Sequence, residues 1–128
     1  MSEESSKAVG SIGWTDLTVK NADEVLNFYK EVVGWQAGEV NMGSYNDYCV
    51  NEPATGKTVA GICHASGVNA EVPPVWLIYI TVEDLEKSAS RCVELGGQVI
   101  AGPRPAGEHG KFCVIRDTAG AVVGLFEY

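Results

Sequence analysis

The stretch Trp14-Thr15-Asp16-Leu17-Thr18-Val19 has a counterpart further along the chain in Leu77-Ile78-Tyr79-Ile80-Thr81-Val82. Side chains on alternate positions of each stretch differ in character, with a period of two that is typical of a β-strand. Each stretch leads into a helical pattern that ends at a glycine, Gly34 in the first copy and Gly96 in the second. The repetition predicts a duplicated module, because two copies are too few for a solenoid.

The segment after each strand predicts an amphipathic helix. Asn21, with Glu24 three residues later, predicts a capping box at the first helix, and Asp84 predicts the cap of the second. Apolar residues at spacings of three and four predict the buried stripe of each helix. These residues are Val25, Phe28, Tyr29, Val32 and Val33 in the first helix, and Leu85, Ala89, Cys92 and Val93 in the second.

Each copy closes with two apolar strands around a turn that contains glycine. Asn46-Asp47 is interpreted as a turn or loop, and Gly102-Pro103-Arg104-Pro105 as a break after the strand that starts at Gln98. Each half is then β-α-β-β-β, which makes the fold class α+β with two tandem modules. The expected organisation is a disordered N-terminus (1–8), a first module (9–63), a linker (64–75) and a second module (76–128) within one domain.

Composition and charge restrict the partners. The chain has 128 residues, 45% of them hydrophobic, and a formal net charge of −8. A nucleic acid or an anionic membrane surface would need a basic face, so neither is an expected partner. No apolar run approaches the roughly 20 residues that span a bilayer. We do not expect the acidic N-terminus to be a secretory signal, and the four cysteines form no Cys-x-x-Cys pair. We expect a cytoplasmic protein with buried free thiols; a disulfide or a reactive thiol is the alternative.

One face of each predicted sheet has no helix to cover it. The residues that this face would present include Trp14, Asp16, Thr18, Tyr79 and Thr81. They combine aromatic bulk with polar groups, whereas a structural face would carry more Val, Ile and Leu. The pattern therefore predicts a ligand cavity on the helix-free faces.

Several motifs in the same order resemble the vicinal oxygen chelate superfamily of glyoxalase I, bleomycin-resistance proteins and extradiol dioxygenases. They are Trp14-x-Asp16-Leu17-x-Val19, Phe28-Tyr29-x-x-Val32-Val33-Gly34-Trp35, Glu94-Leu95-Gly96-Gly97, Gly110-Lys111-Phe112 and Asp117-x-x-Gly120-Ala121. The resemblance extends from about residue 10 to residue 128. It implies glyoxalase-like U-shaped sheets around a cleft, and a homodimer.

The resemblance also implies a test for a metal ion. Metal-dependent members carry His or Gln early on the first strand of each module and Glu on the last strand. The matching positions here are Trp14, Leu77, Gly61 and Gly124, and none has a side chain that ligates a metal. A catalytic divalent ion needs about three protein donors. We therefore expect no intrinsic metal and no other cofactor.

The candidate site residues are few. Asp16 and His109 are the candidates for acid-base catalysis; the predicted ligand-binding residues are Trp14, Asp16, Tyr79, Tyr48, Arg104 and Phe126. Alternatives remain open. Trp14 and Tyr79 could fill a core, Asp16 could bond to a neighbouring backbone group, and Arg104 could be a solvated surface residue. His64 and His109 could be solvated loop residues, and Trp35 and Trp76 are interpreted as structural.

These observations favour binding of a small organic molecule in an aromatic-lined cavity, without an intrinsic metal. The alternative is a lyase, isomerase or dioxygenase of the same superfamily, with a non-standard metal site or metal-free acid-base chemistry. An antibiotic-sequestering protein is a third class, which differs from the first only in its ligand.

Overall fold

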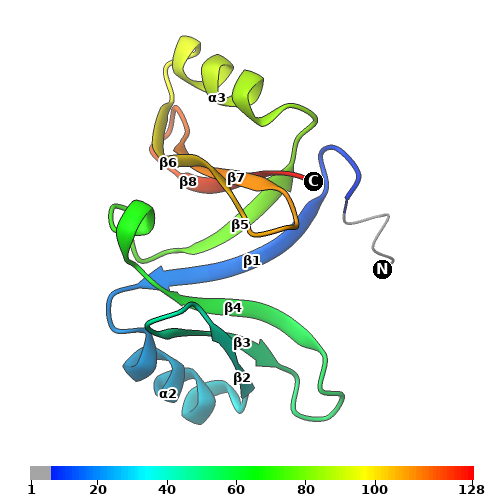
Figure 1. Cartoon of the computed structure of the whole chain (residues 1–128), viewed down its shortest axis with the longest axis vertical. Helices are drawn as coiled ribbons and strands as arrows, with labels where there is room; N and C mark the ends of the chain where they lie inside the picture. Colours follow the sequence, from blue (N-terminus) through cyan, green and yellow to red (C-terminus); the bar gives the residue numbers. More distant parts are fainter. Residues whose placement is uncertain (1–6) are drawn as a thin grey trace. The chain divides into compact units, whose positions relative to one another are not determined.

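The computed structural model describes residues 7–128, so the predicted disorder of residues 1–6 lies outside the described part of the chain (Figure 1). The pattern β-α-β-β-β occurs twice, which confirms the predicted α+β fold with two tandem modules. The first copy comprises β1 (Ile12–Val19), α2 (Ala22–Val33), β2 (Gln36–Asn41), β3 (Asn46–Asn51) and β4 (Thr58–His64). A short 3-10 helix, η1 (Gly67–Asn69), follows, and the second copy comprises β5 (Trp76–Thr81), α3 (Leu85–Glu94), β6 (Gln98–Pro105), β7 (Lys111–Arg116) and β8 (Val122–Glu127).

The chain divides into two compact units, which we call the first and second modules. The first module is Thr15–Trp76, and the second is Leu77–Tyr128 together with the described residues up to Trp14. The first few residues of β1 group with the second module because the chain before them bonds to β5. The Gly10 amide donates to the Thr81 carbonyl at 2.8 Å, and the Thr81 amide donates to the Ser11 carbonyl at 2.9 Å.

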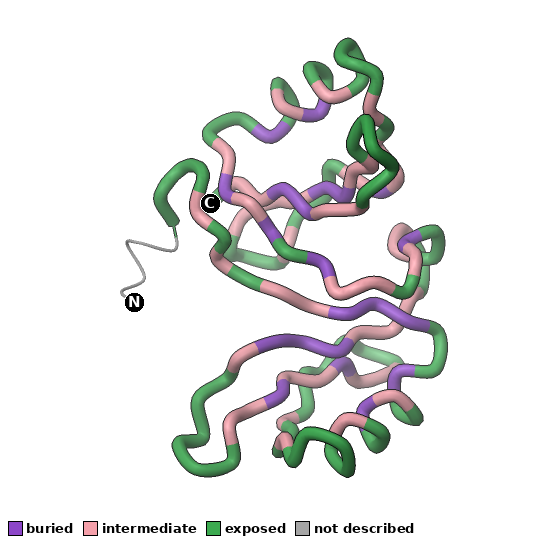
Figure 2. The backbone as a smooth tube through the Cα atoms, turned by 180° about the vertical axis from the view of Figure 1, so that it is seen from behind, coloured by how far each residue is buried: buried purple, intermediate pink, exposed green. Residues whose placement is uncertain are grey.

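The sheet of the first module has the strand order β2-β3-β4-β1, in which β1 runs parallel to β4 and the other pairs are antiparallel. Leu17 and Val19 pack into a core with Ile62 and residues of α2. Figure 2 shows buried residues on both the strands and the helices. Because side chains alternate between the two faces of a strand, Asp16 and Thr18 point away from α2. The two faces of β1 are therefore those predicted from its period of two.

The second module repeats this arrangement with the order β5-β8-β7-β6, in which β5 runs parallel to β8. Its core consists of Leu85 and Ala89 of α3 with Cys113 and Leu125 of the sheet, and Ile80 and Val82 pack against it. Leu77, Tyr79 and Thr81 alternate with Ile80 and Val82, so they lie on the helix-free face, as the sequence predicted.

The helix ends follow the sequence in part. Gly34 adopts the left-handed conformation (φ 85°) that closes α2, and the Asp84 side chain accepts from the Lys87 amide at 3.1 Å at the start of α3. The predicted capping box of α2 is wrong in one respect. The Asn21 side chain caps no backbone group; it donates to the Glu24 carboxylate at 2.8 Å instead.

The predicted stripe of α2 is also too wide. Ala22 and Leu26 are buried, whereas Phe28, Val32 and Val33 are 57%, 63% and 51% exposed. Phe28 follows Leu26 by two residues, about 200° around the helix, so one sheet cannot cover both. Val93 of α3 is likewise exposed, at 58%.

Two segments interpreted as breaks belong to strands. Asn46 and Asp47 open β3, and Asp47 is buried. The strand that starts at Gln98 continues to Pro105 and absorbs Gly102 and Pro103 through shifts of register against β7. A Cβ atom on Gly102 would lie 2.7 Å from the Phe112 carbonyl oxygen, so this close approach requires glycine.

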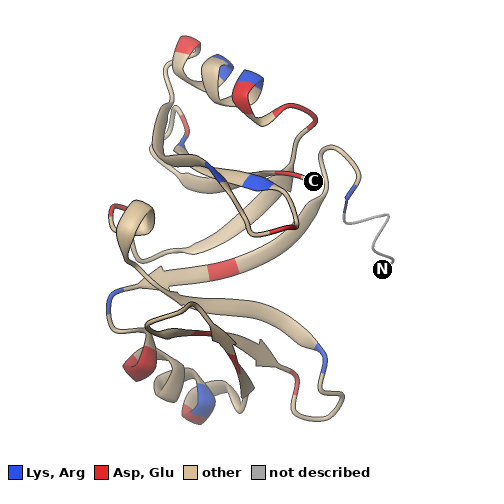
Figure 3. Cartoon of the chain, in the orientation of Figure 1, with Lys and Arg blue, Asp and Glu red and all other residues tan. Residues whose placement is uncertain are grey.

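Charged side chains of both signs occur on both helices (Figure 3). Among the described residues, no helix is both long enough and apolar enough to cross a membrane.

Candidate functional site

Three of the predicted ligand-binding residues share the helix-free face of the second module. Tyr79 of β5 pairs with Gly124 of β8, and Phe126 lies two residues after Gly124 on the same face of β8. Phe126 in turn pairs with Phe112 of β7. Arg104 of β6 pairs with Phe112 in turn. Cross-strand partners point to the same face of a sheet. The register therefore brings Tyr79, Phe126 and Arg104 together and adds Phe112, which the sequence had not singled out.

The rings on this face are at contact distance. The ring centroids of Tyr79 and Phe112 are 6.4 Å apart, and the two ring planes meet edge to face at 72°. The ring centroids of Phe126 and Tyr128 are 4.7 Å apart. Tyr79 is only 8% exposed, whereas Arg104 is exposed at the outer strand. This face combines aromatic surface with the Arg104 cation, in a chain whose net charge is −8.

Glycine at position 124 makes room for the Tyr79 ring. A Cβ atom on Gly124 would lie 2.3 Å from Cδ1 and 2.4 Å from Cε1 of that ring. Real Cβ atoms do not approach other atoms so closely, so any side chain at position 124 requires the ring to move. The two residues therefore form one packing unit.

The other predicted residues lie elsewhere. Trp14 is 39% exposed in the part of β1 that belongs to the second module, and Asp16 is half-buried in the first. Tyr48 packs against the core beneath α2, so it lies on the opposite face of its sheet from Asp16. His109 is exposed in the loop before β7. The register groups neither Tyr48 nor His109 with the aromatic face.

Asp16 has a thiol close to it. Asp16 pairs with Gly61, and Thr18 pairs with Cys63 on the same two strands. Burial raises the pKa of the Cys63 thiol well above its usual value, and the charges of Asp16 and Asp47 add to this effect. The Cys63 thiol is therefore protonated at neutral pH and is a poor nucleophile.

The residues interpreted as structural form an aromatic cluster in the first module. The Trp76 indole donates to the Tyr29 hydroxyl at 3.1 Å, and Trp35 packs against both rings. Trp35 and Trp76 are thus tied to the core of the first module, as expected from the sequence.

The interpretation of His64 as a solvated loop residue is wrong. His64 ends β4, and its side chain is 21% exposed. Its Nδ1 lies 3.3 Å from Asp47 Oδ1, its Nε2 lies 3.5 Å from Asp23 Oδ1, and the Tyr48 hydroxyl donates to Asp23. The four residues come from α2, β3 and β4, so no local sequence pattern links them.

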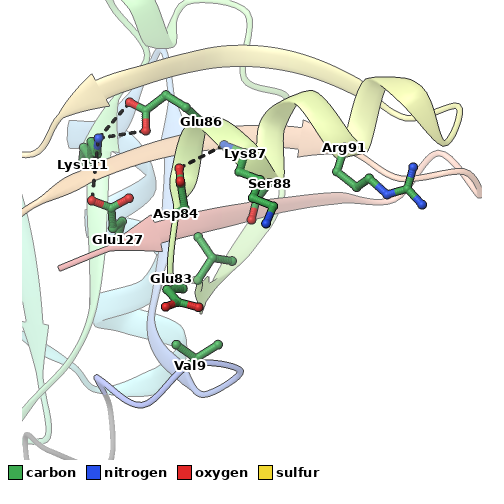
Figure 4. A pocket seen from close by; sticks show the side chains of 10 residues that line it. Val9, Glu83, Asp84, Glu86, Lys87, Ser88, Arg91, Lys111 and Glu127 are labelled. Atoms are coloured by element: carbon green, nitrogen blue, oxygen red, sulfur yellow. Dashed lines mark hydrogen bonds and ion pairs between the residues drawn. The ribbon is translucent and has the colours of Figure 1, made fainter.

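A groove of about 950 Å³ lies beside the start of α3 in the second module (Figure 4). Lys111 donates to both oxygens of Glu86 at 2.8 Å and lies 3.7 Å from Glu127, and Glu127 accepts from the Leu85 amide at 2.8 Å. The bond to Lys111 lowers the pKa of Glu86, and the bond to Glu86 raises the pKa of Lys111. The groove is large enough for a ligand, but these groups already satisfy one another.

Residues 11–125 match the family described as the Glyoxalase/Bleomycin resistance protein/Dioxygenase superfamily. The chain belongs to this superfamily. The protein "Putative glyoxylase CFP32" of Mycobacterium tuberculosis is 30% identical over 118 residues, which cover 92% of this chain and 44% of that protein. "Anthracycline biosynthesis protein DnrV" of Streptomyces peucetius is 28% identical over 90 residues, which cover 70% and 32%. The chain thus spans less than half the length of these two superfamily relatives.

Solved structures with the superfamily fold include the methylmalonyl-CoA epimerases. The enzyme from Mycobacterium tuberculosis has a TM-score of 0.53 and 16% identity, and the match covers 94% of this chain and 91% of that one. A Streptomyces coelicolor epimerase has a TM-score of 0.55 and 13% identity, with coverage of 94% and 98%. At these identities the likeness shows the fold alone.

The positions that match the metal ligands of the superfamily do not fit a divalent ion here. Leu77 is fully buried, Gly61 and Gly124 offer no side chain, and the Tyr79 ring fills the space at position 124. Indole and aliphatic side chains supply none of the donors that such ions require.

Proposed function

We propose that this chain binds a small organic molecule on the helix-free face of its second module, without a metal at the positions used by metal-dependent superfamily members. The packing of the Tyr79 ring over Gly124 carries the proposal. At the position that the resemblance matches to a metal-binding glutamate, this chain has an aromatic ring and no carboxylate. Aromatic and apolar walls with a few polar groups are typical of small-molecule sites.

The chemistry of this face suggests the class of ligand. Phe112 and Phe126 are half-buried and offer stacking surface for a flat or apolar body, and the buried Tyr79 ring contacts Phe112. Arg104 offers a planar cation that binds a carboxylate through two parallel hydrogen bonds. We infer that the preferred ligand is an aromatic or conjugated acid. Trp14 and Asp16 remain further candidate contacts.

The family supports the proposal in general terms. One solved neighbour in the fold is a methylmalonyl-CoA epimerase in complex with methylmalonyl-CoA, so the same fold holds an organic acid derivative in that protein. We expect a homodimer as well, which size-exclusion chromatography with light scattering would test.

The test is a ligand screen on chelator-treated protein, read by saturation-transfer NMR. A panel of aromatic acids is compared with the matching neutral amides. Arg104→Gln should weaken binding of the acids at least fivefold and leave the amides within twofold. Arg91→Gln, which removes an exposed arginine on α3, is the matched control. The proposal is contradicted if the chelator-treated protein binds none of the acids, or if Arg104→Gln binds the acids as tightly as the parent does.

A further inference from the structure

A cavity of about 250 Å³ lies within the first module, at the end of β1. Thr18 and Val19, the last two residues of β1, contribute to its wall. The linker after β4 contributes most of the rest, and the Ala65 amide holds it against β1 by donating to the Val19 carbonyl at 2.8 Å. The linker residues that line the cavity are all apolar: Ala65, Ala70, Val72 and Pro74.

The volume of this cavity limits its ligand to a small molecule. Sites for drug-sized ligands measure about 300–1,000 Å³, whereas an apolar cavity of about 150 Å³ is enough for benzene. None of the described residues that line the cavity is aromatic, so its wall offers no stacking surface. These properties favour a short aliphatic chain over an aromatic ring.

Thr18 supplies a polar group to this apolar wall. The residue is only 4% exposed, and its hydroxyl has no hydrogen-bond partner among the residues that the structure describes. A buried hydroxyl without a partner is unfavourable, and most buried polar groups in native proteins have one. A ligand oxygen that accepts a hydrogen bond from Thr18 would satisfy this group.

The charge beside the cavity is positive. Lys20 is exposed, lines the cavity and forms no ion pair with another described residue. Asn21, which also lines the cavity, caps no amide of α2 with its side chain, so the first turn of α2 keeps its partial positive charge. The two acids of that turn do not line the cavity. Asp23 accepts from the Tyr48 hydroxyl, and Glu24 accepts from the Asn21 side chain at 2.8 Å.

We propose that this cavity binds a short-chain aliphatic carboxylate of about four to six carbon atoms. The alkyl chain contacts Val19 and Val72, which removes apolar surface from water. One carboxylate oxygen accepts from the Thr18 hydroxyl, and the Lys20 ammonium group lies near the charge.

This site is independent of the proposed function. Its lining residues belong to the first module, whereas Arg104 and the aromatic face belong to the second. Arg104→Gln should therefore leave binding of the aliphatic carboxylate unchanged, and changes to Thr18 should leave binding of aromatic acids unchanged. Either proposal can fail while the other holds.

The experiment is a titration of ¹⁵N-labelled protein with pentanoate, followed through the backbone amide resonances. Pentanol and pentylamine, at the same ionic strength, are the neutral and cationic analogues. We expect saturable shifts centred on Thr18, Ala65 and Ala70 for pentanoate. Pentanol should bind at least fivefold more weakly, and pentylamine should give no saturable shift at these residues.

The variants separate the hydroxyl, the charge and the space. Thr18→Val keeps the shape of the side chain and should weaken pentanoate binding at least fivefold, whereas Thr18→Ser keeps the hydroxyl and should bind within twofold of the parent. Lys20→Met should weaken binding at least threefold, and Lys57→Met, which removes another exposed lysine of the first module, should not. Ala65→Leu adds bulk to the wall and should abolish binding.

Amide spectra with the dispersion of the parent verify that each variant is folded. The proposal is overturned if pentanoate gives no saturable shifts at the cavity, or if pentanol binds as tightly as pentanoate. Binding by Thr18→Val as tight as that of the parent also overturns it.

Discussion

Substitution of Gly124 by alanine tests the packing on which the proposed function depends. The new Cβ atom would lie 2.3 Å from the Tyr79 ring, which must retreat by about 1.1 Å to reach an ordinary contact of 3.4 Å. Tyr79 is buried, so it has little room to move. Overpacking of a core costs about 1–3 kcal/mol, and we expect Gly124→Ala to lower the free energy of unfolding by about 2 kcal/mol.

The sign of the effect makes this test sharp. Where no clash exists, a glycine-to-alanine change stabilises a protein by about 0.4–1 kcal/mol, because the unfolded chain loses freedom. Gly38→Ala is the matched control. Its Cβ atom would meet only the Cys49 sulfur, at 2.9 Å, and a thiol at the end of a side chain can turn away.

The assay is equilibrium unfolding in urea, followed by far-UV circular dichroism, on the two single variants and on a double-mutant cycle. In a Tyr79→Leu background the cost of Gly124→Ala should fall by at least about 1 kcal/mol, because the two residues are in contact. A stability of Gly124→Ala equal to or above that of the parent would refute the packing argument. Equal costs in both backgrounds would refute the assignment to Tyr79.

Three further predictions concern other parts of the chain. Lys111→Met should destabilise the protein at neutral pH and low salt. Because the pKa of Glu86 is lowered in the folded state, the difference in stability from the parent should disappear as the pH falls below the usual Glu value near 4.5. Because the pKa of Lys111 is raised, the difference should also disappear as the pH rises above about 10.5 and Lys111 loses its proton. Unfolding curves across pH and salt would measure it, and a difference that persists at pH 2 would count against the ion pair. Desolvation raises the pKa of Cys113 to about 11 and raises that of Cys63 further. At pH 8 both thiols should therefore react with a thiol reagent much more slowly in the folded protein than in urea. Mass spectrometry of the labelled peptides would measure the two rates. Asp84→Ala should cost about 1 kcal/mol in urea unfolding and Asn21→Ala less than half of that, because only Asp84 caps a helix amide; equal costs would contradict this difference.

The parts of the fold that were predictable are those encoded by neighbouring residues. The alternation in β1 and β5 fixed which side chains face the helices, and Gly34 and Asp84 marked helix ends through local backbone chemistry. β2 illustrates the limit. All but one of its residues are exposed, so it carries no apolar period and could not be located from the sequence.

For the candidate site, the sequence could predict only which residues of a single strand lie on its helix-free face. Tyr79, Phe126 and Arg104 were chosen separately, and the register of three strand pairs then placed them on one face. His64 was misinterpreted because its partners, Asp23 and Asp47, are distant in the sequence and meet it only in the folded chain. The burial of a residue at the edge of a helix face, such as Phe28, likewise depends on which part of the folded chain packs against it.

The contact between Tyr79 and position 124 also affects how this chain can evolve. Introducing glutamate at position 124 in one step would drive a side chain into the ring, while trimming Tyr79 first would leave a void beside it. Either single change passes through a weakened intermediate. A laboratory attempt to place a carboxylate at position 124 would therefore need both substitutions introduced together.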